Sequence, residues 1–205
     1  RIPKGELDSK KLCRIAELSE MFADQRVYST NRQNLELHGV SKEKMKELKD
    51  EIEKCGFNTD GVNGLRDMVA CVGKTYCPKA VSTTRNLFDK ILSVVSNEKF
   101  LPIDDKAVIH ITGCPNSCSP YRISDIGFRG MRIRTDLGSV EGYEMLIGGD
   151  QKKHGSKIGE FKEDDCPKVV ETVLDTFMVN RTEGETLTDC IDRVGFETFA
   201  KAVFS

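Results

Sequence analysis

Two closely spaced pairs of cysteines constrain this chain more than any other feature of its sequence. The stretches "CVGKTYC" and "CPNSC" hold Cys71 with Cys77 and Cys114 with Cys118, and thirty-six residues separate the two pairs. Each pair follows a short apolar run that is typical of a β-strand, and each contains the glycine or proline of a turn. We therefore expect two strand ends to bring four thiols to one point.

The total number of cysteines leaves two chemistries to compare. Eight cysteines in 205 residues would suggest a disulfide framework in a small secreted protein. Lys/Glu-rich helical segments, a hydrophobic content of 38% and no visible signal peptide instead indicate the cytoplasm. Because clustered cysteines in that compartment more often bind metal or carry out redox chemistry, we expect a metal or redox site.

Four soft thiolates suit either zinc or an iron–sulfur cluster. Structural zinc favours a C-x2–4-C knuckle, and the C-x5-C spacing of Cys71 and Cys77 is wide for it. The closely packed C-x2-C-x2-C run of bacterial ferredoxins is absent as well. A third interpretation is a set of buried, reduced cysteines that happen to lie beside turns.

The surroundings of Cys77 suggest how a thiolate would be stabilised. Pro78 predicts the start of a helix over 78–95, which would place Cys77 at a helix N-terminus, where the dipole favours negative sulfur. The remaining cysteines lie apart from the two pairs, and we interpret them as structural: Cys13, Cys55, Cys166 and Cys190.

Hydrophobic periodicity predicts the other helices. One covers 8–23 with Asp8 as its N-cap, and a second covers 42–55 with Ser41 as its N-cap. The apolar stripes of these two helices include Leu12 and Met45. Pro167 opens a third helix, and a last helix lies near 186–203.

Short β-rich segments predict strands in "RVYSTN", "LELHGV", "AVIHITG", "DIGFRGMRIR" and "GYEMLIGG". The turn-rich stretch "NTDGVNG" is the predicted boundary, which gives domains 1–60 and 61–205. The charged turn Lys152, Lys153 and His154 after the last of these strands is interpreted as solvated. Since strands and helices both persist to the end of the chain, the predicted fold class is α+β.

Charge and motifs exclude several classes of function. The net charge of −2 provides no basic field for nucleic acid, and no apolar run approaches the roughly 18 to 20 residues of a membrane helix. No G-x-G-x-x-G follows a predicted strand, so neither a flavin nor a nicotinamide site is expected. Electrons for a redox reaction must then come from a separate donor.

Several motifs, taken together and in this order, resemble the sirohaem-containing nitrite and sulfite reductase family. The resemblance is closest to the small, single-module, assimilatory-type sulfite reductases, and it extends from Arg1 to about residue 150. The motifs that carry it are "RIPKGEL", "STNRQNLELHGV", "NGLRDMVAC", the two cysteine pairs, "DIGFRG" and "GYEMLIGGD". The resemblance implies a ferredoxin-like half-domain followed by a mixed-sheet domain with flanking helices that binds sirohaem and a 4Fe-4S cluster.

The resemblance also implies which residues hold the cofactors. Cys71, Cys77, Cys114 and Cys118 would hold the 4Fe-4S cluster, and Cys118 would bridge to the sirohaem iron. Sirohaem is a macrocycle with eight carboxylates, so it needs cations and hydrogen-bond donors around it. The candidates are the polar segment "TNRQ" and the amide in the second cysteine turn: Thr30, Asn31, Arg32, Gln33 and Asn116.

The substrate that the resemblance implies is sulfite or nitrite, and either anion would need a positively charged pocket. The family pattern assigns Arg1, Arg66 and Lys106 to that pocket. This chain departs from the pattern at Asp104, because the family often has two basic residues two positions apart there.

The resemblance also implies binding partners for the reaction, and alternative functions stay open beside it. A separate donor such as a ferredoxin would supply electrons, and a homodimer would complete a pocket that one module leaves open. No nucleic acid and no membrane is expected as a partner. The alternatives are a cluster-only electron-transfer subunit, a sirohaem-fold oxygenase of corrinoid synthesis, and a zinc-stabilised structural domain.

Overall fold

The computed structural model describes residues 1–136 and 138–205, which form two compact units, Arg1–Val62 and Asn63–Ser205. Each unit has its own hydrophobic core. Both contain helices and strands, so the predicted α+β class is confirmed. Among the described residues, no helix is long and apolar enough to cross a membrane.

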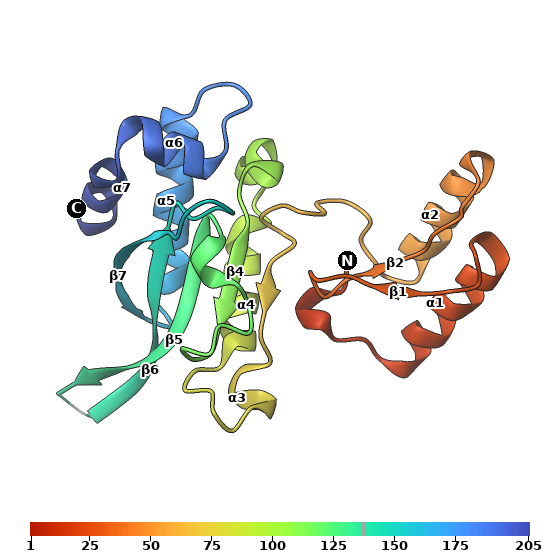
Figure 1. The fold of residues 1–205 in the computed structure, drawn as a ribbon, viewed down its shortest axis with the longest axis horizontal. Coiled ribbons are helices and arrows are strands. Elements are labelled where there is room, and N and C mark those ends of the chain that lie inside the picture. Colours follow the sequence, from red (N-terminus) through yellow and green to blue (C-terminus); the bar gives the residue numbers. More distant parts are fainter. Residues whose placement is uncertain (137) are drawn as a thin grey trace. The chain divides into compact units, whose positions relative to one another are not determined.

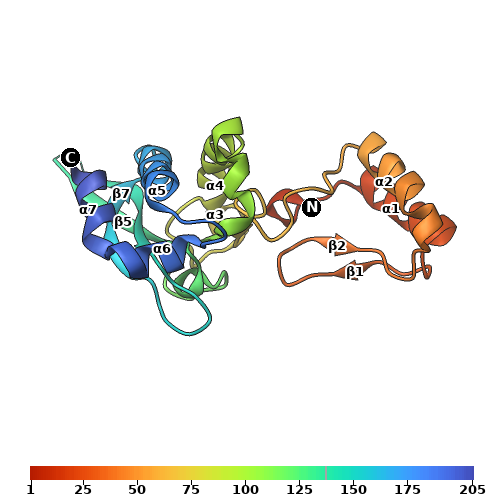
Figure 2. The same cartoon turned by 90° about the horizontal axis from the view of Figure 1, so that it is seen from above.

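The first unit packs two helices with a small antiparallel sheet. Its elements are η1 (Pro3–Gly5), α1 (Ser9–Phe22), β1 (Tyr28–Ser29), β2 (Leu35–Glu36), η2 (Lys42–Lys44) and α2 (Met45–Lys54). Figure 2 shows α1 and α2 side by side. Asp8 caps α1 as expected, because its Oδ1 accepts the amide N–H of Lys11 at 2.9 Å.

Two details of the helix prediction in this unit are wrong. The second α-helix begins at Met45 rather than at residue 42, after a 3-10 turn, and Ser41 makes no side-chain capping bond. Leu12 and Met45 are 51% and 58% exposed instead of buried. Each strand here has only two residues, so the sheet covers only part of each helix.

The second unit is built on a five-stranded sheet in the order β3-β4-β5-β6-β7. The strands are β3 (Val69–Ala70), β4 (Ile109–Thr112), β5 (Ile126–Thr135), β6 (Gly138–Ile147) and β7 (Ser156–Lys162). β3, β4 and β5 are parallel, whereas β6 and β7 run antiparallel to their neighbours. The carboxyl ends of the first three strands therefore lie at the same end of the sheet. No strand was predicted at β7, an edge strand in which only Ile158 is buried.

Helices cover one face of this sheet. The remaining elements are α3 (Gly73–Tyr76), α4 (Thr84–Val95), η3 (Glu98–Lys106), η4 (Tyr121–Ile123), α5 (Cys166–Asn180), α6 (Leu187–Val194) and α7 (Phe196–Phe204). α4 and α5 pack against each other on the same side of the strands (Figures 1 and 2). Their apolar stripes form one core with the strands, which includes Phe88, Ile91, Phe128, Val173 and Phe177. The helix predicted after Pro167 is confirmed as α5.

Two helix predictions in this unit are wrong. The helix expected over 78–95 begins only at Thr84, because the preceding residues are bound to neighbouring backbone: Val81 N–H donates to Gly113 O and Ser82 O accepts from Lys74 N–H. The helix expected near 186–203 is two helices, α6 and α7, which meet at Gly195. Gly195 has a φ of 91°, a backbone conformation that ends α6.

Candidate metal centre

Cys71 and Cys114 follow the carboxyl ends of two neighbouring parallel strands. Cys71 comes directly after β3, and Cys114 lies two residues beyond β4. Ala70 and Ile111 are register partners, so the two strand ends lie side by side. The amide N–H of Gly113 donates a hydrogen bond of 3.1 Å to the Cys71 sulfur. The tertiary structure thus brings the second cysteine segment against the first cysteine.

The other two cysteines are tied to the same place through their neighbours. Cys77 ends the short helix α3, and four residues later Val81 donates its N–H to Gly113 O at 2.9 Å. Beside Cys118, the Ser119 hydroxyl donates to the carbonyl of Val69 in β3 at 3.1 Å. Cys118 is exposed and Cys114 is buried.

The predicted role of the helix dipole at Cys77 is wrong. Cys77 lies at the C-terminal end of α3, and the residues after it form a loop rather than the first turn of α4. A sulfur in this position gains nothing from a helix N-terminus. The interaction that does stabilise a thiolate here is the Gly113 amide on Cys71.

Glycines allow the backbone segments of this site to approach closely. A Cβ on Gly130 of β5 would lie 2.5 Å from the carbonyl oxygen of Gly113 and 2.8 Å from the Ser82 hydroxyl. Gly73 has a φ of 56°, and a Cβ there would lie 2.5 Å from the Thr84 hydroxyl. These contacts leave little freedom to the backbone that carries the cysteines.

The donor set at this place consists of thiols. No cysteine among the described residues forms a disulfide bond. In residues 1–136 and 138–205, no three His, Cys, Asp or Glu side chains stand close enough together to hold a single metal ion. A cluster of several irons is larger than one ion, so its thiolate ligands stand farther apart. Four thiols on two segments that each contain a glycine, with a peptide N–H on sulfur, fit such a cluster.

The cysteines that we interpreted as structural lie elsewhere. Cys166 and Cys190 are buried in the core of the second unit, and burial raises the pKa of both thiols. Cys13 and Cys55 belong to the first unit, in or just after its helices. A raised pKa keeps a thiol protonated, and a protonated thiol is a poor ligand.

Two residues predicted for the anion pocket have carboxylates beside them. The Arg66 guanidinium forms an ion pair of 2.9 Å with Asp104, and their side chains are 18% and 12% exposed. Lys106 forms a pair of 2.7 Å with Asp105, whose side chain is 72% exposed. Asp104 is the position at which this chain departs from the family pattern, and the structure makes it the partner of Arg66.

The residues predicted to bind sirohaem carboxylates lie on loops. Thr30, Asn31, Arg32 and Gln33 form the turn between β1 and β2, which is closed by a 2.9 Å bond from Thr30 N–H to the carbonyl of Asn34. The Thr30 hydroxyl accepts the Arg32 N–H at 3.2 Å.

The two remaining predicted site residues are Asn116 and Arg1. Asn116 is exposed in the turn between Cys114 and Cys118. Arg1 belongs to the first unit, where its Nε donates to the Asp60 carbonyl at 2.7 Å and its side chain is 6% exposed.

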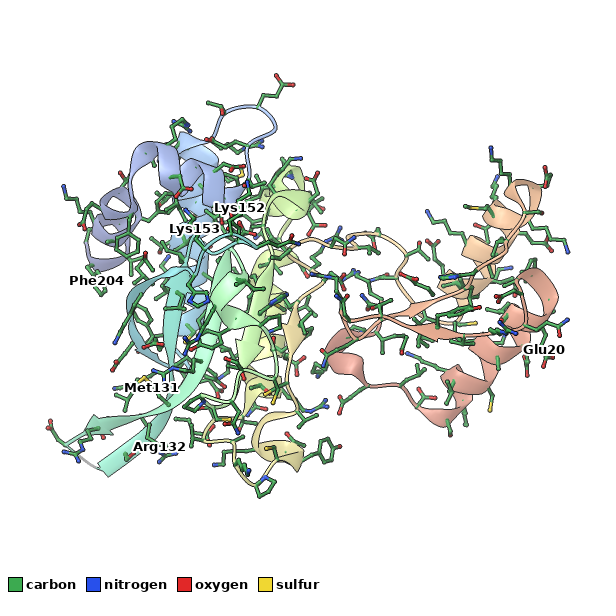
Figure 3. All side chains as sticks on the ribbon, viewed as in Figure 1. Glu20, Met131, Arg132, Lys152, Lys153 and Phe204 are labelled. Atoms are coloured by element: carbon green, nitrogen blue, oxygen red, sulfur yellow. The ribbon has the colours of Figure 1, made fainter. Side chains whose placement is uncertain are left out.

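The charged turn after β6 lies away from the cysteines. β6 is antiparallel to β5, so its C-terminal end is at the opposite end of the sheet from the carboxyl ends of β3 and β4. Figure 3 shows Lys152 and Lys153 at that end and Arg132 on the β5–β6 hairpin at the other. Lys152 and His154 are exposed, and Lys153 forms an ion pair with Asp192 on α6, as expected for a solvated turn.

Sequence reasoning missed three residues that shape this site. Gly113 donates its N–H to the Cys71 sulfur and accepts the N–H of Val81 at its carbonyl. Ser82 donates to Gly142 O at 3.1 Å, and Glu141 accepts hydrogen bonds from the loop between Cys71 and α4. The glycine next to Cys114 was a visible signal. No local pattern marks the other two, because their partners are distant in sequence.

Comparisons with known protein families match both units. A family model described as "Nitrite and sulphite reductase 4Fe-4S domain" matches residues 61–205. A second, described as "Nitrite/Sulfite reductase ferredoxin-like half domain", matches residues 1–55.

Curated relatives have corresponding names. The "Ferredoxin--nitrite reductase, chloroplastic" of Oryza sativa is 27% identical over 90% of this chain and 32% of its own length. "Sulfite reductase [ferredoxin] 1" of Mycolicibacterium paratuberculosis is 26% identical over 89% of this chain and 34% of its own. The "Ferredoxin--nitrite reductase" of Synechococcus elongatus is 31% identical over 72% and 28%. The chain thus spans about a third of the length of these relatives.

Two solved structures share the fold. The Mycobacterium tuberculosis NirA protein is similar with a TM-score of 0.81 and 24% identity over 96% of this chain and 38% of its own. Dissimilatory sulfite reductase I is similar with a TM-score of 0.76 and 13% identity over 99% of this chain and 67% of its own. At these identities the likeness establishes the architecture.

Proposed function

The chain belongs to the nitrite and sulphite reductase family, and on that premise we propose that it is an oxidoreductase that reduces sulfite to sulfide or nitrite to ammonia. Either reaction takes six electrons, which a separate donor would deliver. The relatives' names, which include both nitrite and sulfite reductases, support this proposal. The family resemblance drawn from the ordered set of sequence motifs is confirmed.

The cofactors of this family are the predicted ones, a 4Fe-4S cluster and sirohaem. We assign Cys71, Cys77, Cys114 and Cys118 as the cluster ligands. Cys118 is our candidate for the bridge to the sirohaem iron, and its exposure leaves its sulfur accessible to a second group. When bound, the two groups would relay the electrons of the donor and supply the iron that receives the anion.

The observation that carries the proposal is the hydrogen bond from the Gly113 amide to the Cys71 sulfur, at 3.1 Å. It joins two cysteine segments that are distant in the sequence. Peptide N–H donors at cysteine sulfur stabilise negative charge on a cluster and its ligands. This feature favours a redox centre over four unrelated, buried thiols.

Arg1, Arg66 and Lys106 are our candidates for binding the substrate anion. A fixed positive charge would polarise the S–O or N–O bonds as their oxygens leave as water. The partner of Lys106, Asp105, is largely exposed, so this ion pair is weak and an anion could replace the carboxylate. Arg66 is held more firmly, because Asp104 is largely buried.

The turn of Thr30, Asn31, Arg32 and Gln33 is our candidate for binding sirohaem carboxylates, with Asn116 as a further donor. A tight turn presents guanidinium and amide groups without much loss of conformational freedom. Its internal bonds through the Thr30 hydroxyl support this assignment.

We propose a ferredoxin as the electron donor, in line with the names of the relatives. We propose the cytoplasm as the compartment, on the ground of the clustered cysteines without a disulfide framework. We also propose a homodimer. The first unit contains an apolar groove of about 600 Å³, lined among others by Leu35, Leu37, Met45 and Ile52. The matching family description calls this region a half domain, so a second copy of the chain is the occupant we propose.

The oligomeric state is tested by the mass in solution. Met45 is 58% exposed and lines the groove, so Met45→Asp should yield monomers without unfolding α2. A wild-type chain that sediments as a monomer at micromolar concentration would contradict the dimer.

The function is tested by preparing the full chain anaerobically and measuring iron, acid-labile sulfide, sirohaem and the visible spectrum. We expect one cluster and one sirohaem per chain, and turnover of sulfite or nitrite with a strong artificial donor. The names of the relatives favour neither the oxygenase of corrinoid synthesis nor the cluster-only electron-transfer subunit. A chain that takes up a cluster but no supplied sirohaem would be a carrier, and bound zinc in place of iron would indicate a structural domain.

A further inference from the structure

Glu141 connects the β5–β6 hairpin to the loop that carries the first cysteine pair. Its Oε1 accepts a hydrogen bond from the Lys74 ammonium at 2.5 Å, and its Oε2 accepts the amide N–H of Thr83 at 2.7 Å. Lys74 lies on α3 between Cys71 and Cys77, and Thr83 is the last residue before α4. The carboxylate therefore contacts the loop on both sides of Cys77.

The loop needs such an anchor. α3 has only four residues, too few for a helix to be stable without tertiary contacts. The other contacts of the loop with the sheet involve neutral groups, such as the Ser82 hydroxyl on the carbonyl of Gly142. Glu141 adds two charge-assisted bonds, which are about twice as strong as neutral ones.

The carboxylate is well placed to stay ionised. Burial alone would raise the pKa of Glu141, but the hydrogen bonds from Lys74 and Thr83 outweigh burial and lower it. Thr83 is the N-cap residue of α4, a helix of 12 residues, and negative charge at a helix N-terminus is favourable. One carboxylate thus links the sheet, α3 and the start of α4.

We propose that Glu141 is a positioning residue that holds the loop of Cys71 and Cys77 in the shape that binds the cluster. The inference rests on the proposed function only for the identity of the bound group. Glu141 does not act on the substrate; it acts through the two cysteines, whose sulfur positions depend on the loop.

The charge of Glu141 has a second consequence. Together with Lys74 it forms a neutral pair beside the cysteines. Removing the carboxylate would leave an uncompensated ammonium, and positive charge near a cluster favours its reduced form. The reduction potential of the cluster should therefore rise when Glu141 is neutralised and return toward the wild-type value when Lys74 is neutralised as well.

The first test needs no cofactor. In the reduced apo form of the full chain, iodoacetamide labels each cysteine at a rate that peptide mass spectrometry resolves. In Glu141→Ala we expect labelling of Cys71 and Cys77 to be about tenfold faster, as the loss of charge-assisted bonds opens the loop. Cys13, exposed in the first unit, is the internal reference.

Glu144→Gln is the matched control. Glu144 lies on the same strand and is 15% exposed, but it binds Arg129 at 2.9 and 3.0 Å and does not contact the cysteine loop. Labelling of Cys71 and Cys77 should stay at the wild-type rate in this variant. If Glu141→Ala does not fold, Glu141→Gln and Lys74→Met can replace it, because they nearly keep the side-chain volume. Each of these variants should increase the labelling rate of the same two cysteines. Rates within about twofold of wild type in the folded variants would overturn the proposal.

The second test uses the chain reconstituted with iron and sulfide. In Glu141→Gln we expect a higher reduction potential of the cluster and faster loss of iron to a chelator. In Lys74→Met/Glu141→Gln the reduction potential should return toward the wild-type value, whereas the loss of iron should stay fast. An unchanged potential would overturn the electrostatic part of the proposal. A wild-type chain that binds no cluster would contradict the proposed function, while the labelling rates would still decide whether Glu141 holds the loop.

Discussion

The Arg66 guanidinium and the Asp104 carboxylate form an ion pair of 2.9 Å in which both side chains are largely buried. The main chain reinforces it, because the N–H of Leu65 donates to Asp104 O at 2.7 Å and the N–H of Arg66 to Asp104 Oδ1 at 3.2 Å. A residue predicted to bind a substrate anion therefore already has a counter-ion of its own. We therefore expect removal of the Arg66 guanidinium to lower the stability of the fold, whether or not this residue binds an anion.

We expect Arg66→Ala to lower the free energy of unfolding by about 3 kcal/mol, since it leaves a buried carboxylate without its partner. The double variant Arg66→Ala/Asp104→Asn should recover at least about half of that loss. Urea unfolding followed by circular dichroism measures both. Equal destabilisation in the single and double variants would mean that the unpaired Asp104 carboxylate is not the cause of the loss.

For the reaction, we expect Lys106→Met to keep the cofactor spectrum and lose on the order of a hundredfold in turnover with a strong artificial donor, as for one positioned charge in an enclosed site. Lys99→Met is the matched control, because Lys99 lies on the same η3 segment but binds Glu171 at 2.8 Å. Turnover in Lys106→Met within twofold of wild type would remove this residue from the site.

Cys118→Ser should lower iron and acid-labile sulfide to well under half of the wild-type content, because a serine hydroxyl is a poor ligand for iron. Cys13→Ser provides the comparison, since Cys13 is also exposed but lies in the first unit. Elemental analysis after anaerobic preparation decides the matter. A full cluster with normal spectra in Cys118→Ser would show that Cys118 is not a ligand.

Gly130→Ala should destabilise the cysteine site more than its size suggests. The new Cβ would lie 2.5 Å from the carbonyl oxygen of Gly113, so the backbone of the second cysteine segment must move away from β5. We expect a lower melting temperature and a lower iron content, by circular dichroism and iron analysis. Normal values for both would mean that the contact relaxes at no cost.

Glu141 predicts a dependence of stability on pH. Its pKa is lowered from 4.5 in the folded protein, so its stabilising effect is present above about pH 4.5 and is lost as the pH falls through the lowered value. The difference in unfolding free energy between wild type and Glu141→Gln should be largest near neutral pH and shrink toward pH 3. A difference that stays constant over this range would contradict the assignment.

Local patterns predicted most elements of this fold. Asp8 capped its helix as expected, and the apolar periodicity after Pro167 identified α5, because caps and periodicity depend on neighbours within a few residues. The helix start predicted at Pro78 is wrong because a contact distant in sequence overrides the local preference. Proline is compatible with a helix start, but the bond from Val81 to Gly113 holds this segment as a loop.

The candidate site also has features that local sequence predicts and features that it does not. The spacing of Cys71, Cys77, Cys114 and Cys118 indicated a metal or redox site, and the full set of motifs carried the resemblance to the family. That resemblance, rather than the cysteine spacing, suggested Arg66 and Lys106 as candidates for the anion pocket. What they did not reveal was the partner of each charge, since Asp104 lies 38 residues from Arg66 and Glu141 lies 67 residues from Lys74.

The sequence by itself determined the α+β class, the thiol chemistry and the family, because these follow from residue types and from spacings along the chain. Only the tertiary structure decided that Gly113 donates to the Cys71 sulfur, that Asp104 pairs with Arg66, and that Glu141 anchors the cysteine loop. These contacts depend on the parallel pairing of β3 with β4 and on the β5–β6 hairpin. Strand pairing is a cooperative property of the whole sheet, so no single stretch of sequence specifies it.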